Sequence, residues 1–115
     1  MRIRRLVPEA GFGKLFVVSW CYAEDHPNRL PSPRFYSKLE RFEQDAIEEI
    51  EREGLGVFVA SETGLGKTKF YLYTGSTESL AAFLEKRIPP NETVEFASDN
   101  DEDWREYDKL SQLIE

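Results

Sequence analysis

The stretch that decides the fold reads VFVASETGLGKTKFYLYT and covers residues 57–74. Val57–Ser61 and Thr68–Thr74 are rich in β-branched and aromatic residues, and the second segment alternates with the period of two that is typical of a strand. The connection between them, Glu62–Lys67, contains two glycines, which suit a tight hairpin turn. The stretch therefore predicts a β-hairpin near the middle of the chain.

The end of the same stretch resembles a phosphate-binding P-loop, because Gly66, Lys67 and Thr68 follow one another. The motif needs a glycine five residues before Gly66, and Ser61 stands there instead. A P-loop also runs from a strand into a helix whose N-terminal amides face the phosphates, whereas an alternating aromatic strand follows here. The sequence therefore argues against nucleotide binding.

A long amphipathic helix is predicted before the hairpin. Ser32 is suited to cap its free N–H groups, and Pro33 fits the first helical position because it has no N–H to satisfy. Gly54 marks its end, where a left-handed residue is favoured. Its apolar side chains recur at helical spacing at Phe35, Leu39, Phe42, Ala46 and Ile50, with Tyr36 and Ile47 beside them.

Four further elements surround this helix and hairpin. Leu15–Tyr22 is predicted as a strand with two mostly apolar faces, as in the centre of a sheet. Beyond the hairpin, the patterns predict a helix from Ser76 or Thr77 to Pro89-Pro90, a short strand at Thr93–Ala97, and a third helix from about Asp103.

This order of elements predicts one α+β domain. Two right-handed crossovers produce a ferredoxin-like βαββαβ sandwich, a four-stranded antiparallel sheet with two helices on one face. We expect a single domain over residues 14–115, preceded by a basic arm at residues 1–13. The third helix has an apolar stripe that must be buried, on the open sheet face by preference, or at a sheet edge.

Composition excludes several classes of protein. The 115 residues carry a net charge of −7, with four basic and one acidic group in residues 1–14 and therefore −10 in the remainder. Such a balance argues against nucleic acid as a partner, because a polyanion must be neutralised by Lys and Arg. No run approaches the ~20 apolar residues of a membrane helix. The single Cys21 rules out an internal disulfide and fits a reducing cytoplasm.

Metal and catalytic motifs are incomplete. Residues 99–103 resemble the start of a calcium loop, but Trp104 and Leu110 occupy the positions of its glycine and closing glutamate. His26 lies in a polar loop, and Cys21 lies in a predicted strand without a base nearby in sequence, which favours a small buried core residue. The helix carboxylates Glu43, Glu48 and Glu49 are expected to face water. We therefore predict no catalytic residue, cofactor or metal, and no enzyme.

The aromatic side chains are the better candidates for function. Tyr71 and Tyr73 share one face of their strand, and Trp104 and Tyr107 share one side of the third helix. We predict these four as anchors for a protein partner, with plain core packing as the alternative. Stacking of RNA bases on such a sheet is disfavoured by the acidic charge.

The same residues resemble a known family. The segments LPSPRFY at 30–36, GVFVA at 56–60, FYLYT at 70–74 and DEDWREY at 101–107 resemble the bacterial domain of unknown function 695 over roughly residues 14–110. That family is in turn similar to the RraB-like proteins, acidic domains that bind the endoribonuclease RNase E and restrain its activity. The resemblance implies a binding regulator and supplies no catalytic residue.

Three functions follow from these observations. The first is a small acidic, cytoplasmic regulatory domain that binds a basic protein partner such as a ribonuclease, in the manner of RraB. The second is a small hydrolase or ligand-binding domain with a cleft under the C-terminal helix. The third is a homodimer that covers its open sheet face with its own copy.

Overall fold

The computed structural model describes residues 2–3, 11–21, 33–64, 67–88 and 93–113. Its five strands form one sheet in the order β1-β3-β4-β2-β5, and each neighbouring pair is antiparallel. The α+β class and the four predicted antiparallel strands are confirmed, and β1 is an additional short strand. The strands are β1 (Arg2–Ile3), β2 (Lys14–Cys21), β3 (Val57–Gly64), β4 (Lys67–Thr74) and β5 (Val94–Asn100).

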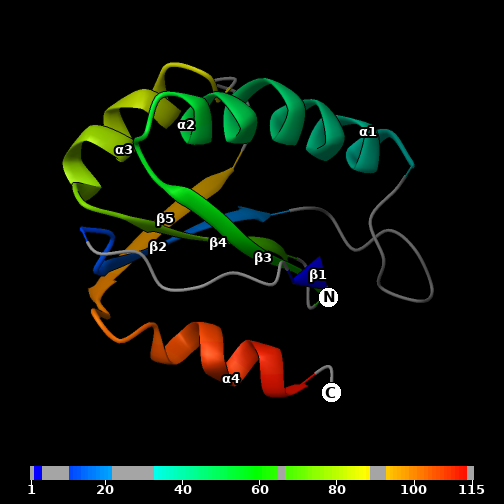
Figure 1. Cartoon of the computed structure of the whole chain (residues 1–115). Coiled ribbons are helices and arrows are strands. Elements are labelled where there is room, and N and C mark those ends of the chain that lie inside the picture. Colours follow the sequence, from blue (N-terminus) through cyan, green and yellow to red (C-terminus); the bar gives the residue numbers. More distant parts are fainter. Residues whose placement is uncertain (1, 4–10, 22–32, 65–66, 89–92, 114–115) are drawn as a thin grey trace.

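Helices cover both faces of the sheet (Figure 1). One face carries α3 (Thr77–Glu85) and a continuous helical rod made of α1 (Pro33–Phe42), η1 (Glu43–Ile47) and α2 (Glu48–Arg52). The other face carries α4 (Arg105–Leu113), as expected of the C-terminal helix. The domain boundary at residue 13 stays a prediction.

The helical rod ends at a glycine and contains a π-helical segment. Gly54 has a φ of 72°, the left-handed conformation predicted for the residue after the last turn. The segment η1 is a π-helix, in which hydrogen bonds span five residues. Phe42 and Ile47, five positions apart, are therefore both able to face the sheet, and both are buried.

The larger core lies between the sheet and these helices. Phe16, Val18 and Trp20 alternate along β2 toward the helices, and none is more than 3% exposed. The Phe42 ring lies 5.3 Å from the rings of Trp20 and Phe70, so an aromatic row joins the rod to two central strands. This packing fixes the rod above the sheet.

A β-bulge in β3 changes which side chains face the rod. Phe58 pairs with Leu72 and Ala60 with Tyr71, so Val59 is the extra residue. Strict alternation would turn Ser61 and Thr63 away from the rod, but the bulge shifts the phase by one residue. Both side chains consequently lie on the side of the rod.

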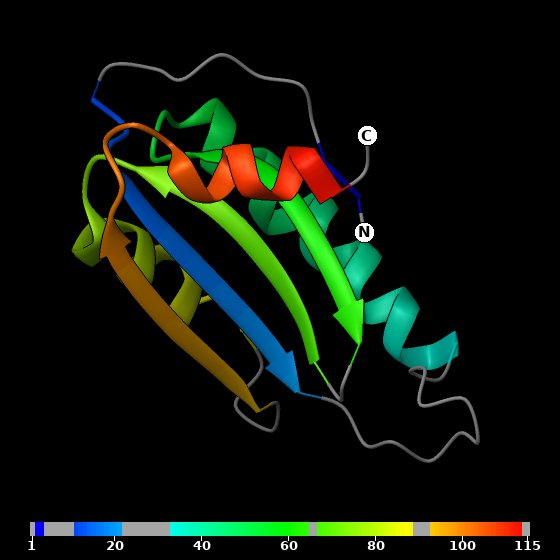
Figure 2. The ribbon, with the colours of Figure 1, turned by 90° about the horizontal axis from the view of Figure 1, so that it is seen from below.

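Helix α4 covers only part of its face. It lies across β3 and β4 and leaves most of β2 and β5 uncovered (Figure 2). Among the described residues, no helix is long and apolar enough to cross a membrane.

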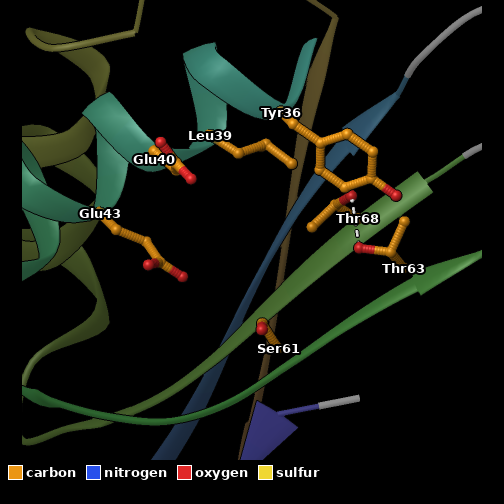
Figure 3. Close-up of a pocket in the computed structure, with 7 residues that line it drawn as sticks. All are labelled: Tyr36, Leu39, Glu40, Glu43, Ser61, Thr63 and Thr68. Atoms are coloured by element: carbon orange, nitrogen blue, oxygen red, sulfur yellow. Dashed lines mark hydrogen bonds between the residues drawn. The ribbon is translucent and has the colours of Figure 1, made fainter. Parts of the chain in front are cut away.

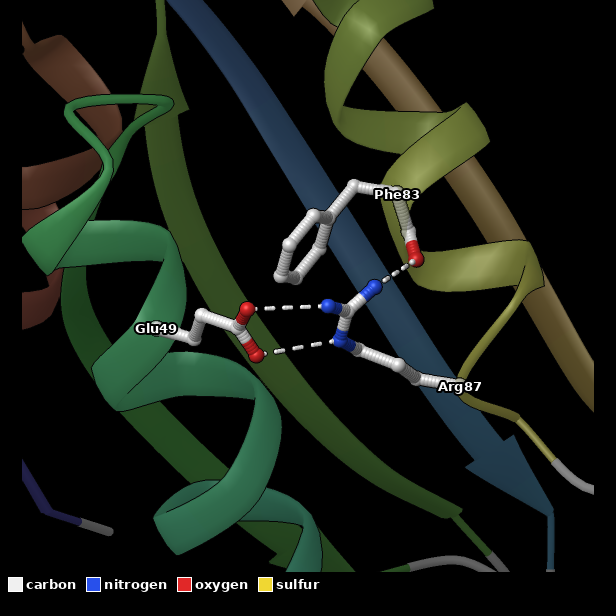
Figure 4. A network of polar contacts seen from close by, with 3 residues as sticks. All are labelled: Glu49, Phe83 and Arg87. Carbon is white, nitrogen blue, oxygen red and sulfur yellow. Dashed lines mark hydrogen bonds and ion pairs between the residues drawn. The ribbon is translucent and has the colours of Figure 1, made fainter.

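A polar contact joins the rod to the end of α3 (Figure 4). Arg87 donates from Nε and Nη2 to the two carboxylate oxygens of Glu49, at 3.3 and 3.0 Å, and from Nη1 to the carbonyl of Phe83 at 3.2 Å. Its guanidinium also lies 3.6 Å from the centre of the Phe83 ring. The fork geometry is favourable, but both charged side chains are about 30% exposed to water.

Replacing Glu49 by glutamine is therefore expected to lower the free energy of unfolding by less than about 1 kcal/mol, because partly exposed ion pairs are screened. Urea unfolding at low and high salt measures the effect, which should shrink at high salt. A loss above about 3 kcal/mol would contradict this assignment, because that size is typical of a buried pair.

Candidate functional site

The four predicted partner-binding residues come together under α4. Tyr71 and Tyr73 project from β4, Trp104 lies just before α4, and Tyr107 lies in its first turn. Their exposed fractions are 7%, 0%, 1% and 8%, and they pack with Val57, Val59, Ala60 and Leu110 in a second core cluster. This arrangement matches the core-packing alternative. While α4 stays in place, a partner has no access to these rings.

Trp104 fastens α4 to the sheet. Its ring stacks on that of Tyr73 with centres 4.3 Å apart and planes within 6°, and its Nε1–H donates to the carbonyl of Phe12 at 2.7 Å. Its φ is 55°, a left-handed conformation that costs free energy for a bulky residue. The stack and the hydrogen bond compensate for this cost and direct the chain from β5 into α4.

Asp101 and Tyr73 complete the N-terminus of α4. Asp101 accepts hydrogen bonds from the N–H groups of Arg105 and Glu106 at 2.8 and 3.0 Å, and from the Tyr73 hydroxyl at 2.7 Å. The Tyr73 oxygen accepts from the N–H of Tyr107 at 3.2 Å. Three N–H groups that lack a partner within the helix are thus satisfied. Asp101 therefore caps the N-terminus of α4.

These contacts shift three pKa values. Burial alone would raise the pKa of Asp101, but hydrogen bonds from Glu106, Tyr73 and Arg105 outweigh it and lower the pKa. Burial, followed by the hydrogen bond to Asp101, raises the pKa of Tyr73 strongly. Burial and the adjacent Glu62 carboxylate, which accepts a hydrogen bond from the Tyr71 hydroxyl at 3.2 Å, raise the pKa of Tyr71 to about 12.

The hydroxyl groups of Tyr71 and Tyr73 are therefore expected to ionise at a higher pH than an ordinary tyrosine. Ultraviolet absorbance after rapid pH jumps should show a tyrosinate component with a pKa of about 12, and Tyr71→Phe should remove it. Glu62→Gln should move the pKa of the same component toward 10, because the negative charge beside the hydroxyl is lost. If Glu62→Gln instead leaves the component unchanged, the contact between Tyr71 and Glu62 does not exist in solution.

A groove lies on the opposite side of the sheet, between the rod and the β3–β4 hairpin (Figure 3). The volume of this groove is about 280 Å³. Tyr36 points toward Thr63 and Thr68, whose hydroxyl oxygens are 3.0 Å apart. The other lining residues are Leu39, Glu40 and Glu43 of the rod and Ser61 of β3.

The groove is suited to hold a cationic group. Carboxylates at Glu40 and Glu43 attract an ammonium or guanidinium ion, and the hydroxyl groups accept further hydrogen bonds. Tyr36 and Leu39 provide apolar contact for an aliphatic chain. The sequence predicts that Glu43 faces water and does not predict the groove that it lines. The only signal was the pairing of Glu40 and Glu43 three positions apart with hydroxyl residues in the hairpin.

Among the other residues weighed and rejected as site candidates, Cys21 and Lys67 lie opposite each other on β2 and β4. Lys67 and Thr68 begin strand β4, so the segment that resembles a P-loop does not lead into a helix. Glu48 is exposed, and Glu49 pairs with Arg87. Cys21 is half-buried rather than buried, and it is the last residue of β2, which is paired with β4 and β5. His26 lies outside the described residues.

Trp20 lies on the opposite face from Tyr71 and Tyr73, so these rings form no common platform for stacked bases. Within the described ranges, no three His, Cys, Asp or Glu side chains are grouped so as to hold a metal ion.

A model of a family of unknown function, DUF695, matches residues 1–111. The chain belongs to the DUF695 family. In this DUF695 domain, two of the segments that carry the resemblance hold both halves of the α4 attachment: Tyr73 lies in FYLYT, and Asp101, Trp104 and Tyr107 lie in DEDWREY. Comparison with curated proteins and with solved structures finds no match. The similarity to RraB-like proteins stays a prediction.

Proposed function

We propose that this DUF695 domain is a non-enzymatic regulatory domain that binds a basic protein partner. The observation that carries the proposal is the charge of the two long segments that border the sheet. Residues 38–53 of the rod carry seven acidic and three basic side chains, a net charge of −4. Residues 93–113, which include β5 and α4, carry seven acidic and two basic side chains, a net charge of −5. Such surfaces speed the encounter with a basic partner.

The aromatic rings are buried under α4, which supports recognition of a partner through the acidic side chains instead. Tyr73 and Trp104 hold α4 on the sheet, so partner binding through them would require α4 to leave. The acidic side chains need no such rearrangement. On the basis of the family resemblance, we propose a cytoplasmic ribonuclease as the partner. The domain would restrain its activity, as RraB-like proteins do for RNase E. The order β3-β4-β2-β5 of the four long strands supports a ferredoxin-like scaffold.

The groove favours a second candidate, a domain that binds a small organic amine. Its carboxylates, hydroxyls and apolar wall suit the ammonium group and chain of such a ligand as well as a Lys or Arg side chain of a protein. The amine spermidine and the amide of arginine serve as probes in calorimetry. Binding that is lost in Glu40→Gln and retained in Asp45→Asn, an exposed carboxylate on the same rod, would support this second function.

Affinity capture from extract of the native cells tests the protein-binding function. We expect immobilised wild-type domain to retain basic proteins at low salt and to release them at high salt. The neutralised variant Asp45→Asn/Glu48→Gln should retain less, and the reversed variant Asp45→Lys/Glu48→Lys should retain least. Equal capture by all three, or by an unrelated acidic protein of the same net charge, would overturn the proposal.

A further inference from the structure

Among the described residues, strand β5 has one unpaired edge. It is the last strand in the order β1-β3-β4-β2-β5, so only its β2 side is paired within the described part of the chain. Two hydrogen bonds frame that pairing, from Cys21 N–H to the Thr93 carbonyl at 2.9 Å and from Asp101 N–H to the Gly13 carbonyl at 2.8 Å. Because backbone groups alternate in direction along a strand, the even-numbered residues between them turn their N–H and C=O outward.

The outward groups form a short, well-bounded recognition edge at Val94, Phe96 and Ser98. At Asn100 the outward N–H donates instead to the side chain of Asp99 at 2.8 Å, which closes the edge at that end. An added strand therefore finds three donors and three acceptors in one row. Exposed edges of this kind serve as templates for strand addition.

The side chains of β5 define the residues of such a strand. Val94 and Phe96 point into the larger core, whereas Glu95 and Asp99 point to the face that α4 leaves uncovered. Glu95 pairs with Lys67 at 3.3 Å, but both side chains are 41% or more exposed and Lys67 lies two strands inward on β4. A strand added outside β5 thus meets two carboxylates on one face and apolar residues on the other.

A second copy of the chain does not suit this edge. In two-fold antiparallel pairings centred on Glu95 or Ala97, Glu95 lies directly opposite Glu95 or Asp99 of the copy. In a pairing centred on Phe96, Glu95 lies diagonal to both Glu95 and Asp99 of the copy. Like charges at opposite positions destabilise a strand pair, whereas opposite charges stabilise it. Charge therefore selects a basic occupant over self-pairing.

We propose that β5 binds an extended segment of a partner protein, in which basic and apolar residues alternate, as an added strand of the sheet. This inference rests on the proposed protein-binding function and names the surface and conformation that it uses. The apolar residues of the segment would extend the core beside Phe96, and its Lys or Arg residues would face Glu95 and Asp99.

A blocked peptide of alternating valine and lysine, as long as β5, is the probe. In nuclear magnetic resonance of the full chain, we expect peptide binding to slow the amide exchange of Val94, Phe96 and Ser98. The amides of Glu95 and Ala97, which already face β2, should change little. Slowed exchange confined to another surface, or self-association through β5 without peptide, would overturn the inference.

Three variants sharpen the test. Ser98→Pro removes one outward donor without touching the β2 pairing and should weaken binding about tenfold or more. Glu95→Lys/Asp99→Lys should weaken binding to the lysine peptide by at least about tenfold and create binding to a peptide with glutamate in place of lysine. Glu53→Lys/Glu85→Lys changes the net charge equally at exposed helix ends and should retain most of the affinity.

The outcomes separate the two proposals. If Ser98→Pro and the Glu95/Asp99 variant bind the lysine peptide as wild type does while rod variants lose it, the domain still binds basic partners but β5 is not the site. If neither the peptide nor any basic protein binds at low salt, both proposals fail.

Discussion

Replacing Trp104 by alanine is expected to lower the free energy of unfolding by about 3–5 kcal/mol, the usual cost of removing a large buried ring. The side chain is 1% exposed and combines the stack on Tyr73 with the hydrogen bond to Phe12. A domain of this size has only about 5–15 kcal/mol in total, so this loss is a large share of its stability. Urea unfolding followed by circular dichroism measures the loss.

Three further variants show which property of Trp104 matters. Trp104→Phe keeps an aromatic stack but loses the bond to Phe12, so its cost should be intermediate. Trp104→Gly should be less harmful than Trp104→Ala by about 1 kcal/mol, because glycine adopts a φ of 55° without strain. Tyr36→Ala, at a ring that is 41% exposed, is the control and should cost little. An equal cost for Trp104→Ala and Tyr36→Ala would contradict the attachment of α4 by this ring.

Replacing Asp101 by alanine has the second largest expected effect, about 2 kcal/mol at neutral pH, the upper range for a lost helix cap. The change leaves the N–H groups of Arg105 and Glu106 and the hydroxyl of Tyr73 without their shared acceptor. The N-terminal turn of α4 should fray. Backbone amide exchange over residues 105–107 measures this local opening directly.

The Asp101 contribution must depend on pH. Because the folded state lowers the pKa of Asp101 below its ordinary value of 3.8, the carboxylate stabilises the fold fully above that value. The stabilisation is lost as the pH falls through the lower folded-state pKa. Acid titration of unfolding should therefore be steeper for wild type than for Asp101→Asn. Asp103→Asn, at a side chain that is 78% exposed, is the control and should follow wild type.

Much of the fold can be predicted from the sequence, because its helices and strands have strong and regular patterns of apolar residues. The alternation in β4 correctly separated Phe70 and Leu72 from Tyr71 and Tyr73. Helix ends were equally clear, since Ser76 accepts a hydrogen bond from the Ser79 N–H and Gly54 has a left-handed backbone. Such signals are local, so they need no knowledge of which segments meet.

The groove was hidden because it depends on two irregularities. The π-helical segment η1 and the bulge at Val59 each change the phase of a periodic pattern by about one residue. Strict alternation along β3 would therefore turn Ser61 away from the groove, and the helical pattern gave no sign that Glu43 borders one. Likewise, two readings of the aromatic residues were open until α4 was placed, because an aromatic stripe looks the same whether it meets a partner or the chain's own sheet.

The short strand β1 bears on how many partners the domain accepts. Arg2 and Ile3 pair with Ser61 and Ala60, in the middle of β3, so the remaining free stretches of that edge are only a few residues long. A protein with two long open edges can link into chains or fibrils, whereas one with a single usable edge ends any assembly that it joins. Strand addition at β5 would thus have a stoichiometry of one to one. The domain would end a growing sheet and would not allow further strands to be added beyond it.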